Sequence, residues 1–252
     1  MNDNGNNKGA AAERLDIHNS EIPEVCAACE ARHGGICAAL DPQQLLALSK
    51  SSSRHRITSG SELVGDAEAV DHYSNVLSGV VKLTKTLSDG RQQIVGLQFA
   101  PDFVGRPFKD ESALNAEAAT DVALCSFPKA ALERMMRETP GLEHRLLRQT
   151  LKELDEARDW MVTLGRKSAA EKVASLLLLI ARNINPYGDP ESESAEFDLP
   201  LTRADIADYL GLTIETVSRQ LTKLRTEGVI DIRNNRHITV PDLGRLEVRS
   251  GA

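Results

Sequence analysis

Four cysteines are the residues of this 252-residue chain whose type and spacing suit metal or redox chemistry. They are Cys26, Cys29, Cys37 and Cys125. Cys26 and Cys29 form a Cys-x2-Cys pair, in which a tight loop directs both sulfurs at one point, so the pair can bind one metal ion or one cluster. A disulfide framework is disfavoured in a cytosolic protein. Four interpretations stay open: structural zinc, an iron–sulfur cluster, a dithiol redox switch, or unrelated thiols.

A second chemical pattern lies near the C-terminus, on a helix expected from Ile214 to about Glu227. Glu215, Ser218 and Arg219 occupy positions i, i+3 and i+4, so they share one exposed face. Arginine can donate two hydrogen bonds to guanine, glutamate can accept one from cytosine, and serine can contact a base or a phosphate. The residues expected to contact DNA are Glu215, Ser218, Arg219, Thr213 and Thr216. The alternative is that Glu215 and Arg219 form an ordinary ion pair on a solvated helix face.

The segments around this face predict a winged helix-turn-helix. A helix over residues 203–210, a turn at Gly211 and the 214–227 helix follow one another directly. Two short apolar runs, 229–232 and 237–240, then flank a polar turn and predict a small β-wing. This layout places the polar face at the N-terminal end of a recognition helix, which is the part that touches base edges.

A long helix is expected from Pro140 to about Arg166, with Thr139 as its N-cap. Its apolar positions recur at steps of three and four residues, close to the 3.5-residue repeat of helices that pair with each other. The residues expected at a seam between two copies are Leu146, Thr150, Leu154, Ala157, Met161 and Leu164. The alternative is that the helix packs only on its own domain.

Short alternating runs separated by turn residues fill the stretch between Ile57 and Phe127 and predict an antiparallel β-roll or sandwich. The predicted fold class is therefore α+β, with an N-terminal antiparallel β-roll, a long dimerisation helix and a C-terminal winged helix-turn-helix. The expected division is a disordered tail over residues 1–20, a cysteine loop plus β-roll sensory domain over 21–138, the dimerisation helix over 139–167 and the DNA-binding domain over 168–252.

Composition excludes several classes of protein. With 41% hydrophobic and 27% charged residues, the chain is typical of a globular protein. No apolar run approaches the roughly 20 residues that span a bilayer, and the N-terminus lacks the apolar core of a signal peptide, so we expect a cytoplasmic protein without a membrane partner. The net charge of −7 argues against non-specific nucleic-acid binding. The acidity lies mainly before residue 199, because residues 199–252 carry eight basic and seven acidic side chains.

The order of these features closely resembles the FnrL-type, oxygen-responsive FNR branch of the cyclic-AMP receptor protein (CRP/FNR) superfamily. The resemblance covers about residues 20–245, and its most specific segments are 102–107, 157–167 and 208–219. It implies that the β-roll is of the cyclic-nucleotide-binding type and that the protein is a homodimeric transcription activator.

The resemblance also implies that the four cysteines, Cys26, Cys29, Cys37 and Cys125, hold a [4Fe-4S] cluster that is stable without oxygen. In such proteins the intact cluster favours a dimer that binds a TTGAT-N4-ATCAA-like inverted repeat in double-stranded DNA. Oxygen converts and then removes the cluster, and DNA affinity falls. Cys125 lies only about 15 residues before the long helix, so a cluster bound there could alter how that helix is presented. RNA polymerase is an expected partner, with Ser88 to Arg91 as a candidate contact.

One departure from the superfamily concerns nucleotide binding. Members that bind cyclic nucleotides carry a Gly-Glu followed by an Arg-Ser or Arg-Thr pair, and residues 105–120 show neither, so we expect no cyclic nucleotide. Two competing functions remain: a CRP-like regulator with structural zinc or no metal that responds to another signal, and a thiol–disulfide oxidoreductase using Cys26 and Cys29. The oxidoreductase lacks the βαβ context such motifs need. No Ser/His/Asp or paired-carboxylate arrangement indicates any other enzyme.

Overall fold

The computed structural model describes residues 22–27, 29, 31–186, 188–189 and 191–251, so the tail predicted over 1–20 lies outside the described residues. A group of short helices comes first: α1 (Glu24–Ala27), α2 (Ala31–Gly34), the 3-10 helix η1 (Ile36–Ala39) and α3 (Pro42–Ser49). The predicted roll follows as β1 (Ser53–Ile57), β2 (Glu62–Val64), β3 (His72–Ser78), β4 (Val80–Thr86), β5 (Gln92–Phe99), β6 (Phe103–Val104), β7 (Asn115–Ala118) and β8 (Val122–Pro128). The antiparallel roll predicted from the sequence is confirmed.

The roll consists of two four-stranded sheets, ordered β1-β8-β3-β6 and β2-β7-β4-β5, and every strand pair is antiparallel. Strand β7 and the first part of β8 alternate buried and half-buried side chains, as expected where one face of a sheet packs against the other sheet. Gly79 links β3 to β4 at φ +84°, and a Cβ there would overlap the carbonyl oxygen of Asp121. The turn between these strands therefore requires glycine.

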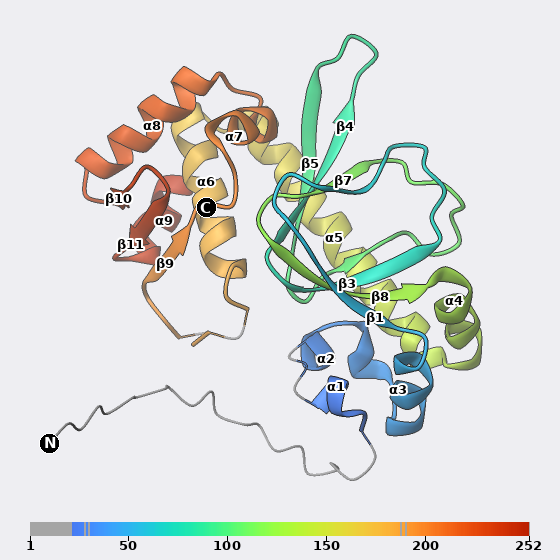
Figure 1. Ribbon diagram of the computed structural model, residues 1–252. Helices are drawn as coiled ribbons and strands as arrows, with labels where there is room; N and C mark the ends of the chain where they lie inside the picture. Colours follow the sequence, from blue (N-terminus) through green and yellow to red (C-terminus); the bar gives the residue numbers. More distant parts are fainter. Residues whose placement is uncertain (1–21, 28, 30, 187, 190, 252) are drawn as a thin grey trace, which may run out of the picture.

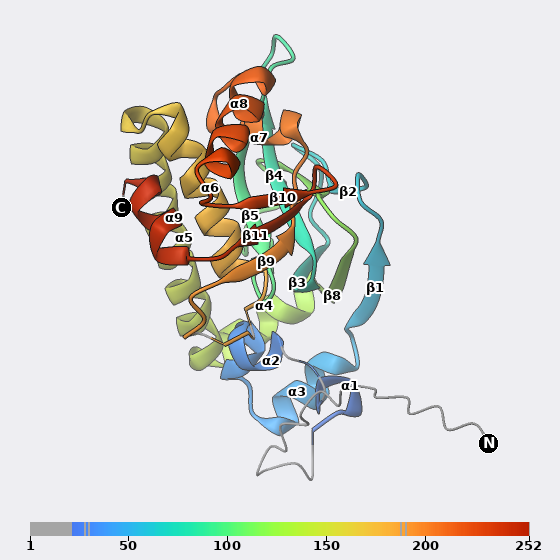
Figure 2. The ribbon, with the colours of Figure 1, turned by 90° about the vertical axis from the view of Figure 1, so that its left-hand side faces the viewer.

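Two helices follow the roll: α4 (Lys129–Glu138) and the long helix α5 (Pro140–Arg166). Pro140 stands at the first helical position, where its missing N–H costs no hydrogen bond. Figures 1 and 2 both show α5 running along the roll, from the short N-terminal helices at one end to the C-terminal domain at the other. The helix thus spans the whole distance between the cysteine-bearing segment and the DNA-binding part. No helix of the described residues is long and apolar enough to cross a membrane.

The predicted seam of α5 needs one correction. Leu146 is only 7% exposed and packs with Ile36 and Leu40 in the core of its own chain, as does Leu142. The apolar side chains that α5 leaves exposed are Leu147, Leu151, Leu154, Met161 and Val162. The helix has two neighbouring apolar stripes, one facing the roll and one facing solvent. A period of 3.5 residues fits both stripes, so it does not indicate which of them is buried in the same chain.

The C-terminal part is a winged helix-turn-helix, as predicted. Its elements are α6 (Ala169–Asn183), β9 (Ala195–Asp198), α7 (Arg203–Leu210), α8 (Ile214–Thr226), β10 (Asp231–Arg233), β11 (His237–Val240) and α9 (Leu243–Ser250). Ser168 and Glu171 form a capping box at the start of α6. Gly211 adopts the left-handed conformation at φ +61°, which ends α7 and turns the chain into α8. The strands of the wing form a three-stranded sheet in the order β10-β11-β9. Strand β9 was not predicted from the sequence.

The roll and the C-terminal domain share one hydrophobic core. Val80 and Ile94 of the roll belong to the same buried cluster as Ile206 and Leu210 of α7. Trp160 of α5 stacks on Tyr209 with ring centroids 4.5 Å apart. The DNA-binding part is therefore packed against strands β4 and β5 and against the last turns of α5.

Candidate cysteine centre and nucleic-acid interface

The four cysteines come from separate segments and line one cavity. Cys26 lies in α1, Cys29 precedes α2, Cys37 lies in η1 and Cys125 lies in β8. In the sheet, Cys125 stands between Arg54 of β1 and Asn75 of β3. The roll therefore supplies one wall of the cavity and the N-terminal helices supply the other. The other residues that line the cavity are uncharged or basic. The uncharged ones are Leu45, Leu48, Leu77, Phe127, Ser49, Ser52 and Asn75, and the basic ones are Arg32 and Arg54.

Two glycines allow the cysteine-bearing segment to lie against the roll. A Cβ on Gly34 would come within 2.7 Å of the Pro101 ring, and one on Gly35 would come within 2.7 Å of the Ala31 carbonyl oxygen. Both distances are too short for any other residue without a shift of the backbone. The glycines between Cys29 and Cys37 are thus required by close packing.

Burial favours the protonated form of three of these thiols, those of Cys26, Cys37 and Cys125. Burial is the main cause that raises the pKa of Cys26, Cys37 and Cys125, and the pKa of Cys37 reaches about 12. Neighbouring cysteine sulfurs raise the pKa values further, which places the four groups within electrostatic reach of one another. Asn75 opposes the shift by donating a hydrogen bond to the Cys37 sulfur over 3.5 Å. A metal must therefore displace protons to bind here.

The four cysteines supply the donor set that a cluster would need. A zinc ion needs all its sulfurs within about 2.3 Å of one point. Among the described residues, no group of three His, Cys, Asp or Glu side chains is placed to hold a metal ion. An iron–sulfur cluster takes one thiolate on each iron, so its four sulfurs surround a larger object. Four cysteines lining one cavity match the number and kind of ligands that a [4Fe-4S] cluster takes.

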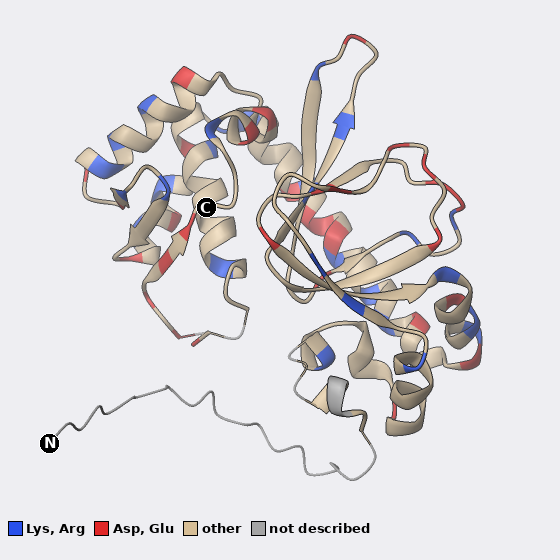
Figure 3. Ribbon diagram, in the orientation of Figure 1, with Lys and Arg blue, Asp and Glu red and all other residues tan. Residues whose placement is uncertain are grey.

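The recognition helix α8 carries the predicted DNA-contacting residues on one side. Glu215, Ser218 and Arg219 are exposed, whereas Val217 and Leu221 on the opposite side are buried. In Figure 3 the ribbon of α8 is coloured blue at several Lys or Arg positions along its length and red at an acidic position near its start. The helix thus presents its polar face to solvent and keeps its apolar face in the domain core.

The N-cap of α8 organises the polar face. Thr213 accepts a hydrogen bond from the Thr216 backbone N–H over 3.2 Å, and the Arg219 guanidinium donates to the Thr216 hydroxyl over 3.2 Å. Hydrogen bonds from its own backbone N–H and from Thr213 lower the pKa of Glu215. Within the part of the chain that the structure describes, no ion pair joins Glu215 to Arg219. Glu215 and Arg219 instead interact with the threonines at the N-terminal end of the helix, contrary to the ion-pair alternative.

The expected seam residues of α5 lie in three different environments. Thr150, Leu154, Ala157 and Met161 are exposed, and Met161 is 72% exposed. Leu164 is half-buried and Leu146 is buried in its own chain. Four of the six residues are therefore open to a second copy, alongside Leu147 and Leu151, which the seam prediction omitted.

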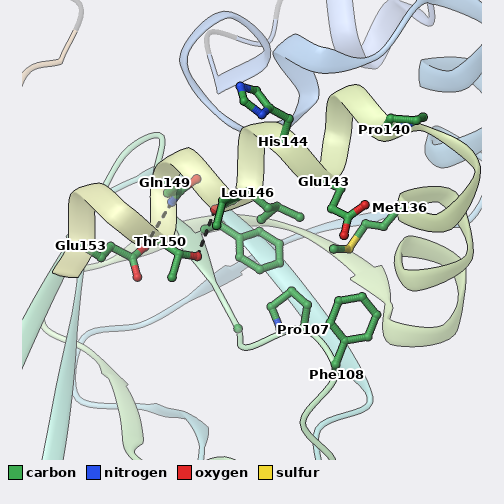
Figure 4. A pocket seen from close by; sticks show the side chains of 13 residues that line it. Pro107, Phe108, Met136, Pro140, Glu143, His144, Leu146, Gln149, Thr150 and Glu153 are labelled. Carbon is green, nitrogen blue, oxygen red and sulfur yellow. Dashed lines mark hydrogen bonds between the residues drawn. The ribbon is translucent and has the colours of Figure 1, made fainter.

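A hollow of about 500 Å³ lies between α5 and the loop that follows β6. Figure 4 shows Leu146, Thr150 and Glu153 of α5 facing Pro107 and Phe108 of that loop. Among the described residues that line it there are two carboxylates, Glu143 and Glu153, and no lysine or arginine. Burial and the neighbouring Asp102 raise the pKa of Glu153. This hollow is therefore unsuited to a phosphate group.

Several residues next to the sites gave no signal in the sequence. Arg54 and Asn75 reach the cysteine cavity through strand pairing, which no sequence motif indicates. Lys82 of β4 forms ion pairs with Asp205 of α7 over 2.8 Å and with Glu117 of β7 over 3.0 Å. Asp205 also belongs to the capping box at the start of α7. These contacts join elements that are far apart in the sequence, so no local motif indicates them.

Comparison with known proteins agrees with this architecture. The family model described as a cyclic nucleotide-binding domain matches residues 54–139, and the one described as a Crp-like helix-turn-helix domain matches residues 171–249. A probable transcriptional activator of Rhizobium leguminosarum bv. viciae is 56% identical over 238 residues, which cover 92% of this chain and 98% of that protein. The transcriptional activator protein FnrL of Cereibacter sphaeroides is 43% identical over 235 residues, with 92% and 95% covered.

A solved structure gives the same result. FixK2 from Bradyrhizobium japonicum matches with a TM-score of 0.71 and 33% identity, over 80% of this chain and 98% of that chain. The chain therefore belongs to the CRP/FNR family of transcription regulators. Within the family it is a DNA-binding transcriptional activator of the FNR/FixK type and not an enzyme.

Proposed function

We propose that this activator senses oxygen through a [4Fe-4S] cluster held by Cys26, Cys29, Cys37 and Cys125. The observation that supports this most directly is the cavity that these cysteines line together, although three of them precede the roll and the fourth lies in β8. When bound, the cluster supplies an oxygen-labile link among the four thiolates. The sensory part would comprise residues 21–138, the dimerisation helix 139–167 and the DNA-binding part 168–252.

The cysteine-bearing segment is in direct contact with α5. The Arg145 guanidinium donates a hydrogen bond to the Gly34 carbonyl, between Cys29 and Cys37. Ile36 lies in the same buried cluster as Leu142 of α5. Gln44 of α3 donates to the Thr139 hydroxyl, just before α5 begins, over 3.1 Å. Holding the cysteines together would thus fix the segment on which the first turns of α5 rest, a shorter route than the covalent path from Cys125.

The helix α5 would then pair with the same helix of a second copy. Its exposed stripe of Leu147, Leu151, Leu154, Ala157 and Met161 recurs every three to four residues, as in a two-helix seam. A twofold dimer places its two recognition helices about 34 Å apart, the spacing of successive major grooves. The proposed target is a TTGAT-N4-ATCAA-like inverted repeat in double-stranded DNA. Loss of the dimer would leave each copy with half of these contacts.

Contact with DNA would rest on the exposed side of α8. Glu215, Ser218 and Arg219 would meet base edges, with Thr213 and Thr216 at the N-terminal end of the helix near the backbone. The turn between β4 and β5, which carries Ser88 to Arg91, is the proposed contact for RNA polymerase.

We further propose that the roll binds no cyclic nucleotide. The hollow beside α5 is large enough for a small molecule, but its charged walls are acidic. A nucleotide phosphate needs cationic or N–H donors, and two carboxylates would repel it. The roll would then have a structural role, connecting the cysteine cavity to α5 and α7.

The decisive experiment compares protein purified without oxygen before and after exposure to air. We expect visible absorbance, about four irons and four sulfides per chain, and a dimer that binds the inverted repeat. Air should remove the absorbance, the dimer and the DNA affinity together. A colourless, iron-free protein would contradict the proposal, and stoichiometric zinc would favour the alternative regulator with structural zinc. DNA binding that depends on an added cyclic nucleotide would contradict the role proposed for the roll.

A further inference from the structure

Two arginines face the same cavity as the four cysteines. Arg54 of β1 stands opposite Cys125 in the register of the sheet, and both line the cavity. Arg32 enters from α2 and is only 6% exposed. The described lining residues include no aspartate and no glutamate. Among the described residues that line the cavity, the charged side chains other than the thiolates are therefore the two arginines.

The charge of the proposed occupant makes these arginines relevant. Four thiolates carry four negative charges, and a [4Fe-4S] core with two positive charges leaves two of them uncompensated. Anionic groups taken out of water are costly unless a cation lies nearby. A guanidinium keeps its positive charge at every physiological pH, so it can serve as a permanent counter-charge.

We propose that Arg54, together with Arg32, is a positioning residue that acts through the cysteine thiolates and retains the cluster by compensating its negative charge. This inference rests on the proposed function, because it assumes that the cavity holds the cluster. It adds two residues outside the ligand set, one of them from a strand that carries no cysteine.

The electrostatics of the cavity support this role. The positive charge of Arg54 acts on Cys26 and on Cys125, and in both cases it opposes the rise in pKa that burial causes. Arg32 acts on Cys26 in the same direction. The geometry agrees: Arg54 is paired with Cys125 in the sheet and lines the same cavity as Cys26.

The test is the rate at which a ferrous chelator removes iron under anaerobic conditions. Three variants are compared with the unmodified protein: Arg54→Met, Arg54→Lys and Arg56→Met. Arg56 lies on the same strand, pairs with Ala123 and does not line the cavity, so it is a matched control. We expect Arg54→Met to lose iron about two- to fivefold faster, the scale of a partly exposed charge pair. Arg54→Lys and Arg56→Met should behave like the unmodified protein.

Ionic strength provides a second measurement. Arg54 is exposed, so salt should screen its effect, and the difference between Arg54→Met and the unmodified protein should shrink as salt is added. Circular dichroism checks that each variant is folded. Equal rates for Arg54→Met and the unmodified protein, or equal losses in Arg54→Met and Arg56→Met, would overturn the inference alone. An iron-free unmodified protein would overturn the proposed function and this inference with it.

Discussion

The exposed polar face of α8 comes from one short stretch of chain, whereas the four cysteines of the cavity come from two distant parts, residues 26–37 and strand β8. On α8, Glu215, Ser218 and Arg219 share a face because of helical spacing alone. At the cavity, Cys125 meets Cys26 and Cys37 only because the roll folds and the N-terminal helices pack onto it. A local pattern therefore suffices for the first site, and the second depends on tertiary structure.

This difference predicts different vulnerabilities. Damage to the roll or to its contacts should disturb the cysteine cavity while leaving α8 helical. Damage to the polar face of α8 should leave the cavity unchanged. The variants below use this contrast, from the largest expected effect to the smallest.

Cys125→Ser should have the largest effect, because it removes the sole ligand that the roll supplies to the proposed set. We expect complete loss of cluster assembly, with the protein still folded, since a serine fits the half-buried position. Iron and sulfide content and the anaerobic absorbance spectrum measure this. Ser126→Ala, on the same strand, is the control. A normal spectrum in Cys125→Ser would remove this residue from the ligand set.

Ala157→Glu should oppose dimer formation, because it places a carboxylate at the exposed seam of α5 in both copies. We expect at least about a tenfold weaker dimer, on the scale of roughly 1.4 kcal/mol for two like charges at short range. Analytical ultracentrifugation at several concentrations measures the dissociation constant. Glu156→Ala is the control, and an unchanged dimer in Ala157→Glu would contradict pairing through this stripe.

Arg219→Ala should weaken DNA binding by about 1–3 kcal/mol and relax the preference at one G·C pair. The cluster content should not change, because Arg219 lies in the other region. Binding to the inverted repeat and to single-base variants of it measures both effects. Arg225→Ala, at the far end of the same helix, is the control. Equal losses on every sequence would indicate a phosphate contact.

Lys82→Met tests the connection between the two regions. Its loss leaves the carboxylates of Glu117 and Asp205 side by side and largely buried. We expect a loss of about 1–3 kcal/mol of folding free energy, measured by urea unfolding, since a partly buried pair is being broken. Lys85→Met is the matched control, because its pair with Asp66 is far more exposed and should contribute at most about 1 kcal/mol. Equal losses in the two variants would mean that Lys82 contributes no more than a surface pair.

Local rules accounted for much of this molecule. The turn at Gly211 between α7 and α8 could be predicted because it depends on residues a few positions apart. The alternating runs likewise predicted the strands of the roll. Neither the strand β9 nor the partners of Lys82 could be predicted, because their contacts join residues far apart in the chain.

The long helix shows where periodicity reaches its limit. The repeat over α5 indicated an apolar seam, but Leu146 faces its own roll while Leu147 and Leu151 face solvent. A helix with two adjacent apolar stripes shows the same repeat whichever of the two stripes packs against the roll. Only packing against Ile36 and Leu40 decides which stripe is left exposed.

The sequence by itself determined the polar face of α8, the strands of the roll and the presence of a long helix, because these depend on local spacing and capping. The tertiary structure decided that four distant cysteines surround one cavity and that Arg54 stands beside them. It also decided that the segment between Cys29 and Cys37 rests on α5. These three arrangements follow from strand register and close packing between elements, and none of them is encoded in the spacing of neighbouring residues.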